Sequence, residues 1–206
     1  SDSASVEARV TIRNASPEPQ DLTLHSVIIG PGGEEIATDS SPAQIAPGDT
    51  QEVKATFVLP RPELWGIDSP RLYTIQNRLS TGDTMRDEVH TRFGIRQAEF
   101  RSDSGFWLNG RHLKIKGVCL HHCAGAMGAA VPLSVWEFRL NRLRALGVNA
   151  IRTAHNPVAP EFLDLCDRMG LLVMDEFFDC WKVGKRRQDY HRHFDEWAHR
   201  DMRDTI

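Results

Sequence analysis

The chain has 206 residues, of which 40% are hydrophobic and 26% are charged, as in an ordinary globular protein with one large domain or two modest ones. Its formal net charge of −3 predicts no binding to nucleic acid or to an anionic membrane surface, and no apolar run approaches the ~20 residues of a membrane-spanning helix. The first 99 residues carry 15 acidic and 9 basic side chains, whereas the remaining residues carry 13 and 16, so we predict two units of different character.

Residues 1–97 have the sequence pattern of an all-β domain. Apolar and polar residues alternate over residues 6–12 and 53–57, with the period of two that half-buried strands show. Proline, glycine and aspartate residues that favour turns separate the apolar runs, which gives about six or seven short strands. We predict an immunoglobulin-like β-sandwich without a disulfide, with a spacer or scaffold role.

Residues 98–206 have a mixed pattern in which short apolar runs alternate with helix-like segments. Asn109-Gly110 predicts a tight hairpin turn near the start of this part. After this turn, apolar runs and helix-like segments follow in the order that is typical of parallel strands joined by helices. The third apolar run, residues 171–174, is apolar on both faces, as in a strand covered on both sides. The strands are predicted over residues 115–120, 148–151 and 171–174, and the helices over residues 134–146, 160–169 and 194–206.

Capping signals and periodicity define these three helices. Ser134 and Glu137 have the spacing of a capping box, and Gly147 and Gly170 are placed to end the first two helices in the left-handed conformation. Apolar side chains at helical spacing predict the buried faces. These faces comprise Trp136, Leu140, Leu143 and Leu146; Phe162, Cys166 and Met169; and Phe194, Trp197, Ala198 and Met202.

Side chains that can bind a ligand or transfer a proton follow each of the three apolar runs. Because the carboxyl ends of parallel strands lie at the same edge of a sheet, we expect these side chains to converge on one rim, where α/β proteins hold their active sites. They are His121 and His122 after the first run, Arg152, His155 and Asn156 after the second, and Asp175 and Glu176 after the third.

The four cysteines predict neither a disulfide framework nor a metal site. No pair has C-x-x-C spacing, and the chain is large enough to be stable without disulfides. Cys123 with His121 and His122 offers ligand types that suit zinc, but buried, unpaired thiols are the better interpretation. We expect no metal and no cofactor.

Ordered motifs run through nearly the whole chain. They include Phe93-Gly94-Ile95-Arg96, Phe106-x-Leu108-Asn109-Gly110, Lys116-Gly117-Val118, His121-His122, Asn149-Ala150-Ile151-Arg152-Thr153-Ala154-His155-Asn156-Pro157 and Val173-Met174-Asp175-Glu176. Together these motifs resemble glycoside hydrolase family 2, the family of β-galactosidases and β-glucuronidases.

The resemblance implies an immunoglobulin-like sandwich over residues 1–97, followed over residues 98–206 by the first three β/α units of a truncated (β/α)8 TIM barrel. Three units cannot close a barrel of eight strands, so we expect the barrel to continue beyond this sequence. The family uses a retaining pair of glutamates, one of them in an Asn-Glu dipeptide after the fourth strand. This sequence contains no Asn-Glu dipeptide. We therefore expect the acid/base and the nucleophile beyond Ile206, and no activity from these residues alone.

The resemblance gives the rim residues substrate-binding or supporting roles. His121 and His155 are expected to contact the sugar, and Arg152 to hold one of the absent carboxylates ionised. Asn156 orients the loop or a sugar hydroxyl, while Asp175 and Glu176 accept sugar hydroxyls or pair with Arg152. Some members bind magnesium through Glu-x-His at the end of the third strand, but Phe178 stands at the histidine position here, so we expect no such site.

The implied parent protein is a retaining exo-glycosidase that hydrolyses terminal β-linked sugars, most similar to a β-galactosidase. Two alternatives stay open: a non-catalytic carbohydrate-binding or scaffold fragment, and a β-glucuronidase parent, because the rim does not separate galactose from glucuronate. The expected partners are a carbohydrate substrate and, at the open strand edge, the rest of the barrel or a second copy of the protein. The resemblance favours a bacterial periplasmic or secreted location.

Overall fold

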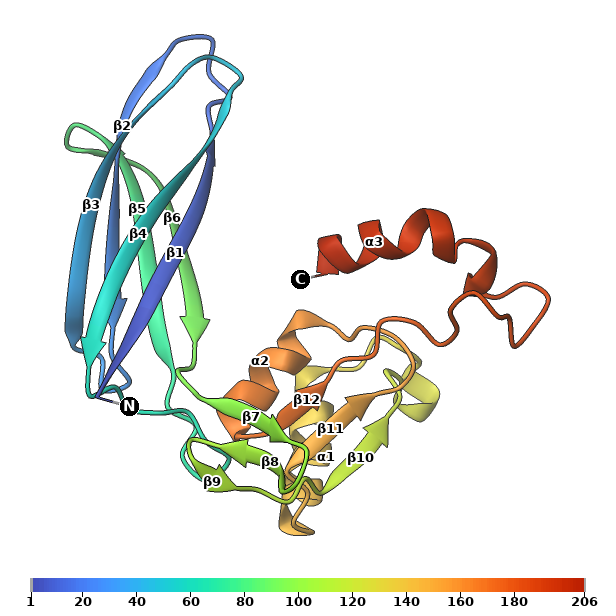
Figure 1. Cartoon of the computed structure of the whole chain (residues 1–206). Helices are drawn as coiled ribbons and strands as arrows, with labels where there is room; N and C mark the ends of the chain where they lie inside the picture. The colour runs from blue at the N-terminus through green and yellow to red at the C-terminus, as the bar shows by residue number, and fades with distance from the viewer. Residues whose placement is uncertain (1, 206) are drawn as a thin grey trace. The chain divides into compact units, whose positions relative to one another are not determined.

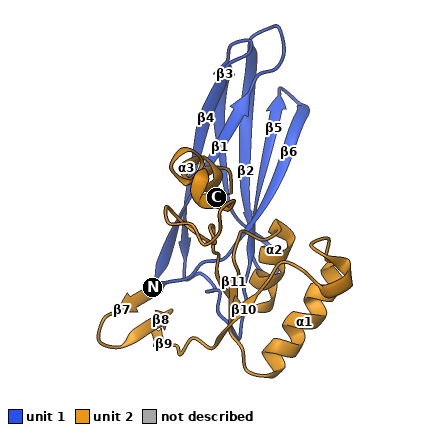
Figure 2. Cartoon of the chain, turned by 90° about the vertical axis from the view of Figure 1, so that its right-hand side faces the viewer, with its two compact units in different colours: residues 1–97 blue, residues 98–206 orange. Residues whose placement is uncertain are grey.

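The computed structural model describes residues 2–205. The chain divides into two compact units, residues 1–97 and 98–206 (Figures 1 and 2). Within the described residues, no helix combines the length and the apolar character that crossing a membrane requires.

The first unit is a sandwich of two antiparallel sheets. One sheet pairs β1 with β4, and the other has the strand order β3-β2-β5-β6. Side chains from both sheets pack into shared clusters, such as the contact group of Ile28, Phe57 and Ile75. The strands are β1 (Ser3–Arg13), β2 (Gln20–Ile29), β3 (Glu35–Ile45), β4 (Thr50–Pro60), β5 (Tyr73–Thr81) and β6 (Thr84–Phe93).

Strand β4 shows why this sequence forms a sandwich. Val53, Ala55, Phe57 and Leu59 are buried, whereas the residues between them are exposed. Burial of a side chain the size of Val53, Phe57 or Leu59 contributes about 1.5–3 kcal/mol relative to exposure, so the alternation fixes which face of the strand points inward. The prediction of a β-sandwich is confirmed.

The second unit contains a small antiparallel sheet and a parallel β-α-β-α-β segment. The parallel sheet has the order β10-β11-β12, with Val118 opposite Ile151 and Ile151 opposite Val173. Its elements are β7 (Ala98–Arg101), β8 (Gly105–Leu108), β9 (Arg111–His112), β10 (Gly117–Leu120), α1 (Leu133–Ala145), β11 (Ala150–Thr153), α2 (Pro160–Met169), β12 (Leu172–Met174) and α3 (Phe194–Thr205), with short 3-10 turns at Gly125–Met127 and Tyr190–Arg192.

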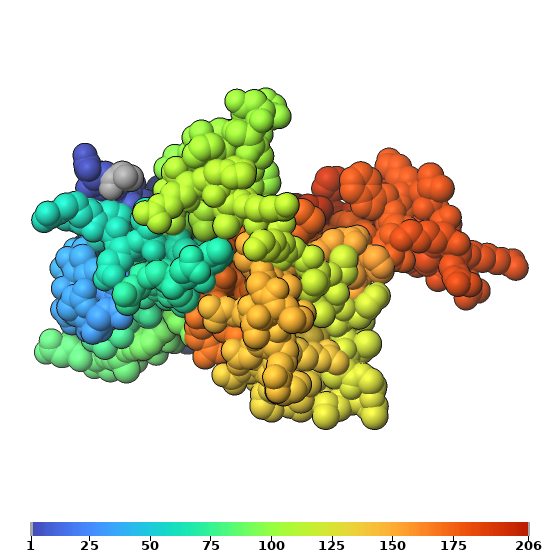
Figure 3. Space-filling model, turned by 90° about the horizontal axis from the view of Figure 1, so that it is seen from below, coloured from blue at the N-terminus to red at the C-terminus, as the bar shows by residue number. Residues whose placement is uncertain are grey.

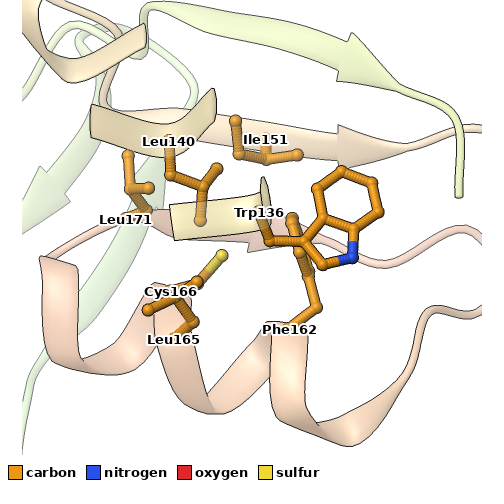
Figure 4. Packing of buried hydrophobic residues seen from close by; sticks show 7 residues of the cluster. All are labelled: Trp136, Leu140, Ile151, Phe162, Leu165, Cys166 and Leu171. Atoms are coloured by element: carbon orange, nitrogen blue, oxygen red, sulfur yellow. The ribbon is translucent and has the colours of Figure 1, made fainter. Parts of the chain in front are cut away.

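Helices α1 and α2 pack against one face of the parallel sheet. Leu140 is fully buried, and the rings of Trp136 and Phe162 meet edge to face with centroids 4.9 Å apart. Figure 4 shows these side chains converging between the helices and β11. The cluster consists of Trp136, Leu140, Ile151, Phe162, Leu165, Cys166 and Leu171. This packing holds the strand ends that carry the polar rim.

Several helix boundaries agree with the sequence pattern. Helix α2 spans the predicted residues, and both Gly147 and Gly170 adopt positive φ angles, of 84° and 71°. Asn109 and Gly110 also have positive φ angles, as the predicted turn requires. The capping box is wrong, because α1 begins at Leu133 with Pro132 at the N-cap position, which places Ser134 inside the first turn.

Some side chains that were predicted to lie on buried faces of helices and strands are exposed. Leu146 is 81% exposed because it lies at the C-cap of α1, beyond the last helical turn that faces the sheet. Trp197 and Met202 are exposed on α3, and only Ala198 of its predicted face is buried. Met174 is 66% exposed, so β12 is not covered on both faces in the described residues.

Candidate functional site

Side chains from the carboxyl ends of all three parallel strands meet at one edge of the sheet. The rings of His121 and His155 make an edge-to-face contact with centroids 5.6 Å apart. Nη2 of Arg152 lies 2.6 Å from Oε2 of Glu176, and Nδ1 of His155 lies 3.2 Å from Oε1 of the same carboxylate. Four of the six predicted site residues therefore form one connected group.

Strand alternation directs Arg152 to this group. Ile151 packs under the helices, so its neighbour Arg152 faces the other side of the sheet, in register with Cys119 and Met174. The guanidinium donates to Sγ of Cys119 at 3.5 Å and pairs with Glu176. The sulfur and then the carboxylate raise the pKa of Arg152, which is charged at any relevant pH.

Thr153 links the ends of the second and third strands. Its side chain is almost fully buried, and Oγ1 donates to Oδ1 of Asp175 at 2.7 Å while accepting from the backbone N–H of Glu176 at 2.8 Å. The hydroxyl thus fixes where Glu176 leaves β12. Asp175 was predicted to bind sugar or Arg152, but the structure pairs it with Thr153. The polar threonine at the end of an apolar run was the sequence signal for this contact.

A second carboxylate approaches His155 from the loop after β12. Oδ1 of Asp179 lies 3.8 Å from Nδ1 of His155 and 2.7 Å from Nζ of Lys185. The hydrogen bond from Lys185 lowers the pKa of Asp179, and the same bond raises the pKa of Lys185. Both groups are therefore charged at neutral pH. The sequence alone gives no indication that Lys185 pairs with Asp179.

A cavity of about 610 Å³ opens beside the two histidines. This volume is within the range of small-molecule sites, about 300–1,000 Å³. Its outer wall comes from the loop after β12 and from α3, which project from the sheet and its two helices in Figure 3 (red). The lining residues are His121, His155, Asn156, Pro157, Phe177, Phe178, Asp179, Tyr190, Asp201 and Thr205.

The outer wall contains two stacked aromatic rings, one of which carries a hydrogen-bonded hydroxyl group. The rings of Phe178 and Tyr190 stack with centroids 4.9 Å apart. The hydroxyl of Tyr190 donates to Asp201, and burial together with this carboxylate raises the pKa of Tyr190 to about 12. Tyr190 and Asp201 could not be predicted from the sequence, because the loop between β12 and α3 has no periodicity from which a common face can be inferred.

The other candidate residues take separate positions. Asn156 lines the cavity and donates through Nδ2 to the carbonyl oxygen of Pro157 at 2.9 Å. His122 is exposed and is not among the cavity-lining residues. Trp181, in the loop after β12, is 69% exposed. The peptide bond between Ala154 and His155 is cis.

The cysteines and histidines after β10 do not assemble into a zinc site. Within residues 2–205, no group of three or more histidine, cysteine, aspartate or glutamate side chains has the arrangement needed to hold a metal ion. All four thiols are free, but Cys119 and Cys123 are exposed, so the prediction of burial is wrong for these two. Burial raises the pKa of Cys166 to about 12.

Family comparisons agree with both units. A sequence profile described as glycosyl hydrolases family 2 matches residues 1–96, and the profile for the TIM barrel domain of glycosyl hydrolases family 2 matches residues 100–196. The chain belongs to glycosyl hydrolase family 2. The predicted fold, an immunoglobulin-like sandwich followed by the start of a family 2 TIM barrel, is confirmed.

Family 2 relatives carry two different activities in their names. A β-galactosidase of Bacteroides ovatus is 41% identical over 95% of this chain and 23% of its own length. A putative β-glucuronidase of Formosa agariphila is 40% identical over 90% of this chain and 17% of its own length. The crystal structure of a family 2 member from Bacteroides cellulosilyticus superposes with a TM-score of 0.92 and 34% identity, over all of this chain and 26% of that one. The chain thus spans about a quarter or less of these family 2 proteins.

Proposed function

We propose that this family 2 chain supplies the sugar-binding rim of a retaining β-glycosidase whose substrate is a terminal β-galactoside. The observation that supports this proposal is the joint placement of His121 and His155 at the cavity, with Arg152 and Glu176 holding His155 from behind. A retaining mechanism needs two further carboxyl groups, about 5–5.5 Å apart, which we assign to barrel units outside residues 1–206.

His155 has one ring nitrogen occupied and one left for substrate. Nδ1 faces both carboxylate oxygens of Glu176, at 3.2 and 3.4 Å, so Nε2 on the opposite side of the ring serves the sugar. In this role Nε2 accepts a hydrogen bond from a sugar hydroxyl. That hydroxyl becomes more acidic as positive charge develops on the ring, so the bond strengthens in the transition state and lowers the barrier.

Charge at the cavity favours a neutral sugar over a uronate. The described lining residues include the carboxylates Asp179 and Asp201 but neither lysine nor arginine. Two cations of the rim and its neighbouring loop are already bound, since Arg152 pairs with Glu176 and Lys185 pairs with Asp179. The carboxylate of a glucuronide would meet repulsion here, whereas galactose meets hydrogen-bonding groups and aromatic rings.

A β-glucuronidase is the second candidate, supported by the 40% identity with the Formosa agariphila relative. In that case a cation from another part of the barrel would bind the uronate carboxylate. A non-catalytic role is the third candidate, either in carbohydrate binding or as a scaffold. Both forms of this role predict no turnover of the substrate.

Kinetics of the protein at its natural length separate these candidates. We expect hydrolysis of 4-nitrophenyl β-galactoside to exceed that of the matching β-glucuronide. His155→Ala should lower kcat/KM about 100-fold, the usual loss for one hydrogen-bonding group used in the transition state. His199→Ala, which changes an exposed histidine on α3, is the matched control and should leave kcat/KM unchanged.

Three other outcomes of these kinetic measurements would each contradict a different part of the proposal. Faster hydrolysis of the glucuronide would transfer the assignment to a β-glucuronidase. Unchanged kinetics for His155→Ala would refute the proposed role of the rim, and the absence of turnover on both substrates would favour the non-catalytic role.

A further inference from the structure

We infer that Asp179 and Lys185 are positioning residues that fix the tautomer and the ring orientation of His155. The consequence for catalysis rests on the proposed function, whereas the effect on the histidine itself does not. Asp179 also lines the cavity, whereas Lys185 is not among the lining residues. They act from the side of the imidazole that faces away from Nε2.

Nδ1 of His155 faces carboxylate oxygens from two separate segments of chain. Oε1 and Oε2 of Glu176 lie at 3.2 and 3.4 Å, and Oδ1 of Asp179 lies at 3.8 Å. An ionised carboxylate can only accept hydrogen bonds, so the ring nitrogen that faces it carries the proton. The neutral ring is therefore the Nδ1–H tautomer, with the lone pair of Nε2 available at the cavity.

Each of the two carboxylates is anchored by a cation of its own. Nη2 of Arg152 lies 2.6 Å from Oε2 of Glu176, and Nζ of Lys185 lies 2.7 Å from Oδ1 of Asp179. Nδ1 of His155 is therefore close to two anions, and each anion is paired with a cation of its own. A carboxylate behind an imidazole also raises the basicity of the opposite nitrogen, as it does for metal-bound histidines.

The backbone of Lys185 is fixed, so its side chain starts from a defined position. The backbone N–H groups of Lys185 and Arg186 donate to Oδ2 of Asp189 at 2.7 and 2.6 Å. The carboxylate of Asp189 also accepts from the backbone N–H of His191 at 3.1 Å. Asp189 thus folds the loop on itself, and Nζ of Lys185 reaches back to Asp179.

This pair stabilises the fold little, which makes its purpose testable. The side chains of Lys185 and Asp179 are 58% and 47% exposed, and exposed ion pairs contribute little to stability. A merely structural surface pair would therefore leave His155 unaffected when it is removed. A positioning pair would change the state of the ring while the chain stays folded.

The test is the nitrogen spectrum of the histidines in the 206-residue chain, recorded above the histidine pKa range. ¹⁵N chemical shifts distinguish a protonated from an unprotonated ring nitrogen, and loss of one signal set in His155→Gln assigns the residue. We expect the Nδ1–H tautomer to dominate at His155. Asp179→Asn should at least double the population of the other tautomer, and Lys185→Met should shift it in the same direction by a smaller amount.

Lys182→Met is the matched control, because Lys182 lies in the same loop and pairs with the exposed carboxylate of Asp195 at 2.8 Å. It should leave the spectrum of His155 unchanged. An Nε2–H tautomer in the unmodified chain, or a tautomer ratio that Asp179→Asn does not change, would overturn the inference. In the natural-length enzyme, Lys185→Met, which changes a residue outside the cavity lining, should lower kcat severalfold with little change in KM.

The two readouts separate this inference from the proposed function. Absence of any glycoside hydrolysis with the expected spectra would refute the proposed function and leave the positioning of His155 intact. Hydrolysis with an unaffected tautomer ratio would refute the positioning alone.

Discussion

Replacing Thr153 with valine removes a buried hydroxyl group while nearly preserving the shape of the side chain. In the native chain this hydroxyl donates to Asp175 and accepts from the N–H of Glu176, at 2.7 and 2.8 Å. Valine can make neither bond. The carboxylate and the amide therefore lose a partner at the point where β11 and β12 end, immediately behind the rim.

The magnitude follows from these two contacts. A hydrogen bond to a charged group contributes about 1.5–3 kcal/mol, and a buried N–H left without a partner costs about 1–3 kcal/mol. Asp175 is only partly buried, so water can replace part of its loss. We expect Thr153→Val to lower the free energy of unfolding of the second unit by about 3 kcal/mol. Thr153→Ser, which keeps the hydroxyl and loses one methyl group, should cost about 1 kcal/mol.

Urea unfolding followed by the backbone amide signals of β10, β11 and β12 measures this difference in the second unit separately from the sandwich. The expected gap of about 2 kcal/mol corresponds to roughly a 30-fold change in the unfolding equilibrium constant. A loss for Thr153→Val no larger than that for Thr153→Ser would refute the role given to the hydroxyl.

Two further predictions concern the core and the cavity wall. Leu140→Ala should lower the free energy of unfolding by about 3 kcal/mol, because Leu140 is fully buried, whereas Leu146→Ala, at a position 81% exposed, should change it by less than about 0.5 kcal/mol in the same urea experiment. The raised pKa of Tyr190, about 12 against an ordinary value of 10.0, stabilises the fold below pH 10, and this contribution should be lost as the pH rises to 12.

Equal losses from the two leucine changes would contradict the packing in Figure 4. For Tyr190, the difference between the ultraviolet phenolate titrations of the native chain and of Tyr190→Phe isolates its pKa from that of Tyr73, the other tyrosine. Burial is the larger cause of the raised pKa and remains in Asp201→Asn, so this variant should lower the pKa only part of the way toward 10, through loss of the carboxylate to which the tyrosine hydroxyl donates. An unchanged titration curve in Asp201→Asn would contradict the assigned contact.

Local regularity explains which parts of the fold could be predicted. The alternation through Val53, Ala55 and Phe57 indicated an inward face because neighbouring side chains of a strand point to opposite sides. Helix α2 was predicted at its observed bounds, since Pro160 and Gly170 mark its ends by their own backbone preferences. Leu146 and Trp197 were misassigned because periodicity identifies a helix face without specifying how much of it a neighbour covers.

The sequence by itself determined that His121, Arg152, His155 and Glu176 follow successive parallel strands, and the geometry of parallel strands brings such ends to one edge. Only the tertiary structure decided which partner each side chain takes. Arg152 binds Glu176 while Asp175 binds Thr153. The loop that returns Lys185 to Asp179 has no repeating pattern, so its contacts depend on how distant residues pack in space rather than on their order along the chain.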